Sequence, residues 1–385
     1  MSASVILLLV CISLVMYTYI GYALLIYLLN RISKKPEGKY TKEPAEWPAI
    51  TVIIPAYNEA AVLPQKIANT LSADYPKHLI SIFIITDGSN DGSESLKFTD
   101  PRITHLHQPV RQGKSAAINQ GVAEANTEII FITDANTMIH PLALKTMTAR
   151  YQKTNVGGVS GEKRIQLNHE ESSVGGEGFY WKYESFLKRE GARFYTVVGA
   201  AGELFSFKKS LFKPLPNDTI LDDFVLSMEI VKQGYVIDYE PKAYAIENPS
   251  KHIADEFKRK VRISSGVWQA LGRLHFLFNP FFNFRLFFQF ISHRFLRWTL
   301  APMAMIAILV ISIAEVQQPV FYILLVLQVI FYALAFTGFL LKNTKLRWPL
   351  IFIPFYYCMM NAAVFAGVWA YFRGRHSVLW EKASR

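Results

Sequence analysis

The chain has 385 residues, of which 51% are hydrophobic and only 18% charged, and it carries a formal net charge of +11. This composition is too apolar for an ordinary soluble protein, and the length allows one sizeable domain with additional segments. Its two cysteines, Cys11 and Cys358, both lie in apolar stretches. They exclude a disulfide framework and a Cys/His metal cluster.

The N-terminal segment is predicted to be a membrane anchor at residues 1–31. Residues 2–30 carry no charged side chain, and about 20 apolar residues span the hydrocarbon core of a bilayer. The segment lacks the basic start and small-residue cleavage site of a secretory signal. Arg31, Lys34 and Lys35 follow directly, which places this end in the cytoplasm. The positive charge therefore indicates membrane lipids, and no nucleic acid, as the partner.

A linker at 32–48 leads into a predicted α/β domain at 49–250. Apolar strands and helical patterns alternate there, which predicts an α/β-layered domain with a largely parallel sheet. The expected strands are Ile50–Ala56, Ile80–Thr86, Ile103–Gln108, Glu128–Thr133 and Val156–Arg164. The expected helices are Glu59–Ser72, Gly113–Ala125, Pro141–Tyr151 and, later in the domain, Val225–Lys232.

The C-terminal third is predicted to be membrane-associated. Residues 251–298 contain a basic amphipathic pattern and then an aromatic one, typical of interfacial helices. Apolar stretches within 299–372 predict transmembrane helices, followed by a basic tail at 373–385. Three spans after a cytoplasmic domain would leave the tail outside, but Arg373, Arg375, Lys382 and Arg385 favour the inside. We therefore expect one re-entrant or hairpinned segment, for which 348–372, with Pro354 and Asn361, is the candidate.

Polar clusters follow the predicted strands, where doubly wound sheets bind ligands. The first strand ends in Pro55-Ala56-Tyr57-Asn58-Glu59, which suits a base or sugar ring, although Asn58 could simply cap a helix that begins at Glu59. The second strand ends at Asp87-Gly88. These residues favour a turn, and Asp87 could also accept a hydrogen bond from a ligand N–H group.

Two further clusters indicate phosphate and metal chemistry. Gly113-Lys114 at a helix start favours a phosphate group, although a solvated lysine is equally compatible, and the missing first glycine excludes a P-loop. Asp134 and Asn136 directly follow the strand that ends at Thr133. Their oxygens could hold a hard divalent cation against substrate phosphates. The alternative for this pair is an Asx turn.

The last clusters indicate an acceptor site and a base. The small residues Gly199-Ala200-Ala201-Gly202 permit either close approach of a ligand or tight packing. The Asp222-Asp223 pair opens a helix, which complements the helix dipole. In a cleft, however, one of two adjacent carboxylates can have its pKa raised and act as a general base. Arg262, on the basic helix, could reach a diphosphate or face anionic lipid.

In this order, from about Thr51 to Trp298 and with the flanking spans, the clusters resemble membrane-integrated family 2 glycosyltransferases of the hyaluronan, cellulose and poly-N-acetylglucosamine synthase type. The resemblance implies a GT-A (Rossmann-like) domain on the cytoplasmic side of the cell (inner) membrane. It also implies a nucleotide-diphosphate sugar donor, expected to be a UDP-sugar, a glycan or lipid acceptor, and Mg²⁺ or Mn²⁺. By the same resemblance, the residues that would contact the donor are Ala56, Tyr57, Glu59, Asp87, Lys114, Asp134 and Arg262. The metal would be held by Asp134 and Asn136. The acceptor would contact Gly199, Ala200, Ala201 and Gly202. Asp223 would be the catalytic base, beside Asp222.

Two positions depart from that family's pattern. Asn136 replaces the usual second aspartate of the metal motif, and its neutral oxygen would lower the affinity for metal. In the Gln-x-x-Arg-Trp motif of processive synthases, the arginine is kept as Arg262, but Ile263 replaces the tryptophan; Trp268 lies on another helix face. The predicted activity is inverting transfer to a growing polysaccharide. The alternatives are a single addition to a membrane lipid, or a non-catalytic nucleotide-sugar-binding subunit of an export complex.

Overall fold

A computed structural model describes residues 2–33, 43–165, 175–248, 253–342 and 348–374, and of residues 175–180 it describes only the backbone. Several sequence predictions fall outside these ranges. They are the linker residues 34–42, the domain boundary between 250 and 251, and the part of the basic tail that begins at residue 375.

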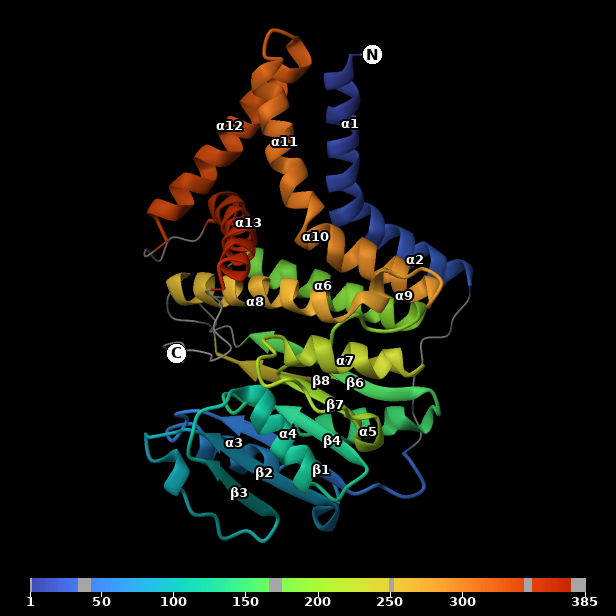
Figure 1. Ribbon diagram of the computed structural model, residues 1–385, viewed down its shortest axis with the longest axis vertical. Helices are drawn as coiled ribbons and strands as arrows, with labels where there is room; N and C mark the ends of the chain where they lie inside the picture. Colours follow the sequence, from blue (N-terminus) through green and yellow to red (C-terminus); the bar gives the residue numbers. More distant parts are fainter. Residues whose placement is uncertain (1, 34–42, 166–174, 249–252, 343–347, 375–385) are drawn as a thin grey trace.

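The domain is built on one mixed sheet of eight strands in the order β3-β2-β1-β4-β7-β6-β8-β5 (Figure 1). β1 pairs in parallel with β2 and β4, and β2 with β3, whereas β7 is antiparallel to both of its neighbours. β6 pairs with β8 in parallel, and β5 with β8 antiparallel. The sheet is therefore mixed: its N-terminal half is parallel as predicted, and the antiparallel strands β7 and β5 interrupt the parallel pattern in its C-terminal half. The strands are β1 Ile50–Ala56, β2 Ile80–Asp87, β3 Ile103–Gln108, β4 Ile129–Thr133, β5 Thr137–Ile139, β6 Val156–Ile165, β7 Leu204–Lys208 and β8 Val236–Glu247.

Helices cover both faces of the sheet because successive strand residues point to opposite sides. In β1, Ile53 belongs to one buried cluster and Ile54 to the other. The first cluster includes α4 (Lys114–Glu124) and α7 (Asp222–Lys232), and the second includes α3 (Leu63–Leu71) and α5 (Ala143–Ala149). The helices on each face are thereby fixed to the sheet through a core that they share with its strands.

The predicted helix from Glu59 begins four residues late, at Leu63. Asn58 has a positive φ of 54°, and its backbone N–H donates to Ser89 Oγ at 3.1 Å. The backbone N–H of Ala60 donates to Asp91 Oδ2 at 3.0 Å. These bonds tie the segment to the loop after β2 and prevent a helical start. The N-cap of α3 is Val62, with no side-chain hydrogen bond, so Asn58 does not cap it.

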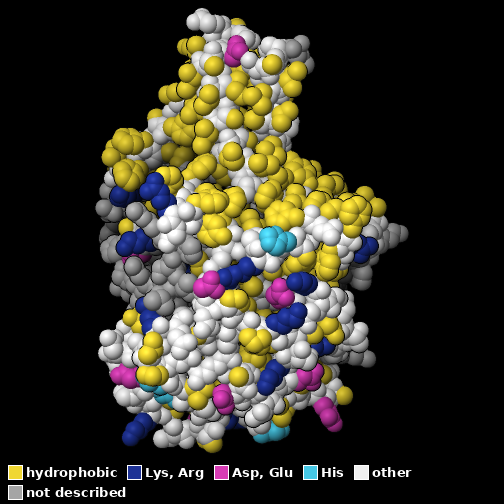
Figure 2. Space-filling view, in the orientation of Figure 1, with side chains coloured by type: hydrophobic (Ala, Val, Ile, Leu, Met, Phe, Trp, Pro, Cys, Tyr) yellow, Lys and Arg dark blue, Asp and Glu magenta, His cyan; other side chains and the backbone are white. Residues whose placement is uncertain are grey.

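Two long helices, α6 (Gly175–Phe194) and α8 (Ile253–Arg273), lie between the sheet and the apolar helices (Figure 1). α9 (Phe284–Gln289), a π-helical segment at Phe290–Phe295 and α10 (Leu296–Trp298) follow α8. Hydrophobic side chains gather over this level and above it, while charged side chains concentrate on the sheet side (Figure 2). This division is what interfacial helices beneath a membrane region require.

Among the described residues, three helices are long and apolar enough to cross a membrane. The first runs from Ala3 to Ile32, through α1 (Ala3–Met16), a π-helical turn (Tyr17–Gly21) and α2 (Tyr22–Ile32); the others are α12 (Pro319–Leu340) and α13 (Pro349–Phe372). A fourth span is counted if Phe284–Trp298 and α11 (Leu300–Ala314), which meet at a bend of 47°, act as one.

The break in the apolar region lies at Thr299 rather than within 348–372. α13 continues as one helix through Pro354, so this segment is not hairpinned. Thr299 has φ −131° and ψ −81°, outside the helical region. Pro302 has no N–H to donate to the carbonyl of Trp298, four residues earlier, so a continuous helix would lose that hydrogen bond. The bend places Trp298 against Phe224 of α7, with ring centroids 5.6 Å apart.

Candidate active site

Lys114 is the centre of a polar cluster at the carboxyl ends of the strands. Its Nζ lies 2.7 Å from Asp134 Oδ1 and 3.5 Å from Asp222 Oδ2. Lys114 is the first residue of α4, Asp134 directly follows β4, and Asp222 is the first residue of α7. Burial acts to lower the pKa of Lys114, but the two carboxylates outweigh burial and raise that pKa above its usual value. The predicted diphosphate, metal and base residues therefore meet around one ammonium group.

Asp223 has the properties expected of a general base. Burial, followed by the neighbouring charge of Asp222, raises the pKa of Asp223 to about 7. Its Oδ1 accepts a hydrogen bond from the backbone N–H of Phe224 at 2.7 Å, which orients the carboxylate. Such a group can accept a proton at neutral pH and still be basic enough to drive the transfer.

The small-residue run lies directly against this carboxylate. A Cβ atom on Gly202 would lie 3.0 Å from Asp223 Oδ2, and one on Gly199 would lie 2.7 Å from the ring of Phe224. Gly199 also has a φ of +89°, which favours glycine. The backbone N–H groups of Ala200 and Ala201 donate to Ser227 and Ser160. Tight packing thus requires small residues here, and acceptor contact by this run stays a prediction.

Arg262 brings a second cation to the cluster from α8. Burial lowers its pKa, while Asp222, Asp223 and Asp134 act in the opposite direction. Within the part of the chain that the structure describes, its guanidinium forms no ion pair within 4 Å. The guanidinium of Arg262 is therefore influenced by the charges of three carboxylates without forming an ion pair with any of them.

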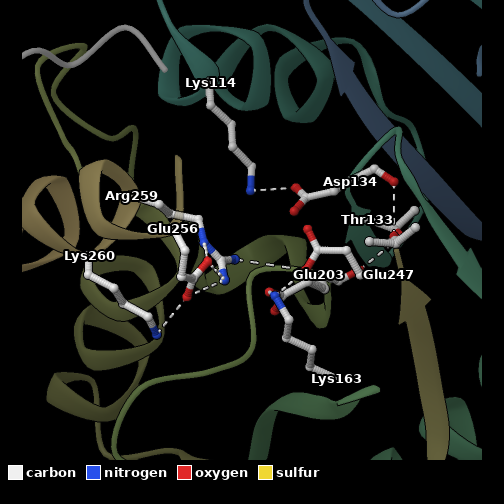
Figure 3. A network of polar contacts seen from close by, with 10 residues as sticks. Lys114, Thr133, Asp134, Lys163, Glu203, Glu247, Glu256, Arg259 and Lys260 are labelled. Atoms are coloured by element: carbon white, nitrogen blue, oxygen red, sulfur yellow. Dashed lines mark hydrogen bonds and ion pairs between the residues drawn. The ribbon is translucent and has the colours of Figure 1, made fainter. Parts of the chain in front are cut away.

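A chain of ion pairs fixes the helix that carries Arg262 (Figure 3). Lys163 of β6 lies 2.5 Å from Glu203 Oε1 and also pairs with Glu247 of β8. Arg259 lies 3.9 Å from Glu247, and 2.7 Å from Glu256 on its own helix. The sequence analysis missed this network. Basic residues at helical spacing were visible in the sequence, but their buried acidic partners come from strands that were not predicted or from distant loops.

Asp87 anchors the loop that precedes Lys114. It is fully buried, and its two carboxylate oxygens accept hydrogen bonds from the backbone N–H groups of Gln112 and Gly113, each at 2.7 Å. Gly113 has a φ of +100°, so the turn favours glycine. Asp87 thereby sets the direction in which α4 presents Lys114, and its predicted contact with a base stays a prediction.

Tyr57 carries an aromatic–cation contact that the sequence analysis also missed. The guanidinium carbon of Arg111 lies 3.4 Å from the centroid of its ring. Ala56 ends β1 and is buried, and Glu59 is only 9% exposed. The Arg111 contact and the loop beyond it connect this corner with Lys114. The predicted nucleoside residues and the predicted diphosphate residue therefore belong to adjoining loops.

The turn after β4 offers hard oxygen donors for a metal ion. The backbone carbonyl of Asp134 accepts from Thr137, and its side chain, which is 30% exposed, pairs with Lys114. The carboxylate is thus directed to the cluster and does not close an Asx turn. The described residues contain no group of three His, Cys, Asp or Glu suited to a metal. One carboxylate and the Asn136 amide fit Mg²⁺ or Mn²⁺ only if phosphate oxygens and water complete the shell.

The arrangement of the sheet and its flanking helices is the GT-A glycosyltransferase fold. It superimposes on a mannosyltransferase, PcManGT from Pyrobaculum calidifontis in complex with GDP-Man and Mn²⁺, with a TM-score of 0.71, covering 96% of this chain and 100% of that one. Sequence identity is 21%, so this similarity concerns the fold alone.

Residues 51–215 match the family model "Glycosyl transferase family 2", and the chain thus carries a glycosyltransferase family 2 domain. It is 28% identical over 235 residues to poly-beta-1,6-N-acetyl-D-glucosamine synthase of Staphylococcus epidermidis, covering 58% of this chain and 56% of that protein. The Staphylococcus aureus synthase is 28% identical over 254 residues, 63% of this chain and 59% of that one. The chain thus matches little more than half the length of these relatives. The predicted family 2 glycosyltransferase domain and its GT-A fold are confirmed.

Proposed function

We propose that the chain is a membrane-bound inverting glycosyltransferase that adds sugars from a UDP-sugar to a growing polysaccharide. The observation that carries this proposal is Asp223, whose pKa of about 7 suits a base, next to the Lys114–Asp134–Asp222 cluster. The similarity to poly-N-acetylglucosamine synthases supports UDP-N-acetylglucosamine as the first donor to test.

The charges of the cluster favour a donor that arrives with a divalent cation. Lys114 and Arg262 supply two positive charges, and Asp134, Asp222 and Asp223 supply up to three negative ones. A diphosphate alone would meet a site without net positive charge. Mg²⁺ or Mn²⁺, held by Asp134 and Asn136, would neutralise charge on the diphosphate. Lys114 and Arg262 would then donate hydrogen bonds to the departing nucleotide diphosphate.

Asp223 would activate the acceptor. Its carboxylate takes the proton of the acceptor hydroxyl as that oxygen attacks the anomeric carbon from the side opposite the diphosphate. The bond between the sugar and the diphosphate breaks, and the anomeric configuration inverts. Gly202, against Asp223 Oδ2, leaves room for the acceptor sugar beside the base. Asp222 supports this role because its charge disfavours ionisation of Asp223.

The proposal places the catalytic domain in the cytoplasm, on the inner face of the cell membrane. Arg31 lies in the last turn of α2, where the first candidate span ends before the domain begins. α6 and α8 lie between the sheet and the apolar helices (Figure 1), so the acceptor site is near the membrane. A glycan could then pass from the site towards the spans, and anionic lipid would meet the basic residues at the ends of the spans.

A single addition to a membrane lipid is the second candidate function. The observation that favours it is Ile263, which follows Arg262 on α8 where processive relatives by resemblance carry a tryptophan. A branched aliphatic side chain gives an acceptor sugar no aromatic face on which to stack. The length of the product separates the two candidates.

The experiment is a donor screen on detergent-purified protein supplemented with membrane lipid. Radiolabelled UDP- and GDP-sugars are supplied with Mn²⁺, with Mg²⁺ or with chelator, and both the released nucleotide diphosphate and the size of the labelled product are measured. We expect one UDP-sugar to be consumed in a metal-dependent way and to give a long product. A short, lipid-extractable product would support the second candidate. The proposal would be refuted if the folded wild type released nucleotide diphosphate from none of the donors.

A further inference from the structure

Lys66 is a fully buried lysine behind the turn that carries Asp134 and Asn136. It lies on α3, where it shares the inward face with Leu63, Ile67 and Thr70. Its Nζ donates to Thr133 Oγ1 at 2.8 Å and to the backbone carbonyl of Thr137 at 2.7 Å. These two residues directly flank the turn, one on each side. A single lysine side chain therefore bridges the two ends of the three-residue connection between β4 and β5.

Thr133 extends this bridge to the acceptor side of the site. Its hydroxyl donates to the backbone carbonyl of Glu203 at 2.9 Å, while its oxygen accepts from Lys66. Glu203 follows Gly202, which lies against the Asp223 carboxylate. Lys66 is thus connected through two hydrogen bonds to the backbone of Glu203, which adjoins the small-residue run, and it is directly bonded to the two residues that flank the metal-motif turn.

A second side chain of α3 holds the far end of β5. Asn69, one turn after Lys66, donates to the carbonyl of Ile139 at 3.0 Å and accepts from its N–H at 2.8 Å. β5 has only three residues and pairs with β8 at the edge of the sheet. Such a short edge strand has little stability of its own. Its position, and that of the turn before it, depends on this polar face of α3.

Burial of an ammonium group is costly, and an apolar side chain of similar shape would fill the same space without that cost. Burial lowers the pKa of Lys66 to about 7, and the charge of Asp134 acts in the opposite direction. A lysine at this position therefore supplies directed donors to the back of the turn, in addition to filling volume.

We propose that Lys66 is a positioning residue that fixes the Asp134–Asn136 turn in its metal- and donor-binding geometry and links that turn, through Thr133, to the loop beside Asp223. This inference rests on the proposed function. Lys66 touches neither donor nor acceptor. It bonds to the Thr133 hydroxyl on one side of the two proposed ligands and to the Thr137 carbonyl on the other. Outer-shell hydrogen bonds act in this way in metal sites, where their loss lowers affinity for metal by about 10- to 100-fold.

The test compares two variants that delete this bridge with one matched control. Lys66→Met keeps the length of the side chain and removes its donors, and Thr133→Val removes the hydroxyl that Lys66 contacts. Thr70→Val is the control, because Thr70 is equally buried on α3 and its hydroxyl bonds only to the Lys66 carbonyl within the helix. Binding of Mn²⁺ in the presence of UDP is measured by electron paramagnetic resonance on each purified full-length chain, together with its melting temperature.

We expect Lys66→Met and Thr133→Val to weaken Mn²⁺ binding at least tenfold, and Thr70→Val to bind as the wild type does at a similar melting temperature. If Lys66→Met does not accumulate as folded protein, the comparison of Mn²⁺ affinity between Thr133→Val and Thr70→Val tests the inference. The inference would be overturned if Thr133→Val or a folded Lys66→Met bound Mn²⁺ as tightly as the wild type does. It would also be overturned if the control Thr70→Val lost as much affinity for Mn²⁺ as they do. Neither result would contradict the proposed function. A wild type that binds no Mn²⁺ with UDP would overturn the proposed function as well.

Discussion

Replacement of Asp223 by asparagine removes the proposed base while preserving the shape of the side chain. The amide oxygen of asparagine can still accept the hydrogen bond from Phe224 N–H, which is 2.7 Å long in the wild type. The raised pKa of Asp223 means that its charged form is disfavoured in the folded chain. A neutral side chain there should therefore cost no stability at pH 7, and loss of activity cannot be ascribed to unfolding.

The expected loss is large and confined to turnover. A positioned general base contributes about 10²- to 10⁴-fold, which corresponds to about 3 to 5 kcal/mol of transition-state stabilisation at 1.36 kcal/mol per tenfold change. Donor binding should be nearly unchanged, because Lys114, Arg262 and Asp134 are intact. Initial rates of nucleotide diphosphate release give kcat, and calorimetric titration with UDP and Mn²⁺ gives the dissociation constant.

The pH dependence supplies an independent check. Because the base acts in its deprotonated form, kcat/KM of the wild type should decrease about tenfold per pH unit below about pH 7, where Asp223 takes up a proton. The residual activity of Asp223→Asn should lack this acidic limb. Turnover by the variant within a few-fold of the wild type, or a wild-type profile that is flat from pH 8 to pH 5, would refute the assignment.

Three further substitutions probe the other parts of the site. Arg262→Gln should raise the donor KM by about 10-fold or more, since a charge-assisted contact with the diphosphate is lost, and an unchanged KM in steady-state kinetics would exclude that contact. Asn136→Asp should lower the Mn²⁺ concentration for half-maximal activity because a charged ligand replaces a neutral one, whereas an unchanged metal titration would leave Asn136 only a turn-forming role. Gly202→Ala places a Cβ about 3.0 Å from Asp223 Oδ2. It should lower kcat by about 10- to 100-fold through displacement of the base, with an unaltered melting temperature, and a normal kcat would show that the acceptor does not need this space.

The pairing of Lys114 with Asp134 could be predicted from the sequence because one topological rule governs it. Parallel strands that alternate with helices bring their carboxyl ends to one edge, so Lys114 and Asp134 could be expected together. This rule does not place Asp222, which follows β7, a strand antiparallel to β4. The acidic pair of Asp222 and Asp223 could be singled out as the source of a base, and the family resemblance selected Asp223 within that pair. Its burial, which is the largest cause of its raised pKa, depends on tertiary packing that the sequence pattern does not contain.

Other features depended on long-range partners that local patterns do not reveal. β8 carries Asp238, Glu240 and Lys242, which disrupt an apolar strand pattern. The charges of Asp238 and Glu240 are tolerated because Arg150 pairs with both. Lys66 resembled any helical surface lysine, although its place on the face of Leu63 and Ile67 was a visible sign of burial.

The central claim is that the cluster of Lys114, Asp134 and Arg262 binds a nucleotide diphosphate together with a divalent cation. The most direct test is calorimetric titration of UDP into the purified wild type and into Asp134→Ala, each with Mn²⁺ and with chelator. We expect the wild type to bind UDP only when Mn²⁺ is present, and we expect Asp134→Ala to lose this binding. Binding of equal strength in the presence of chelator, or in Asp134→Ala, would contradict the central claim.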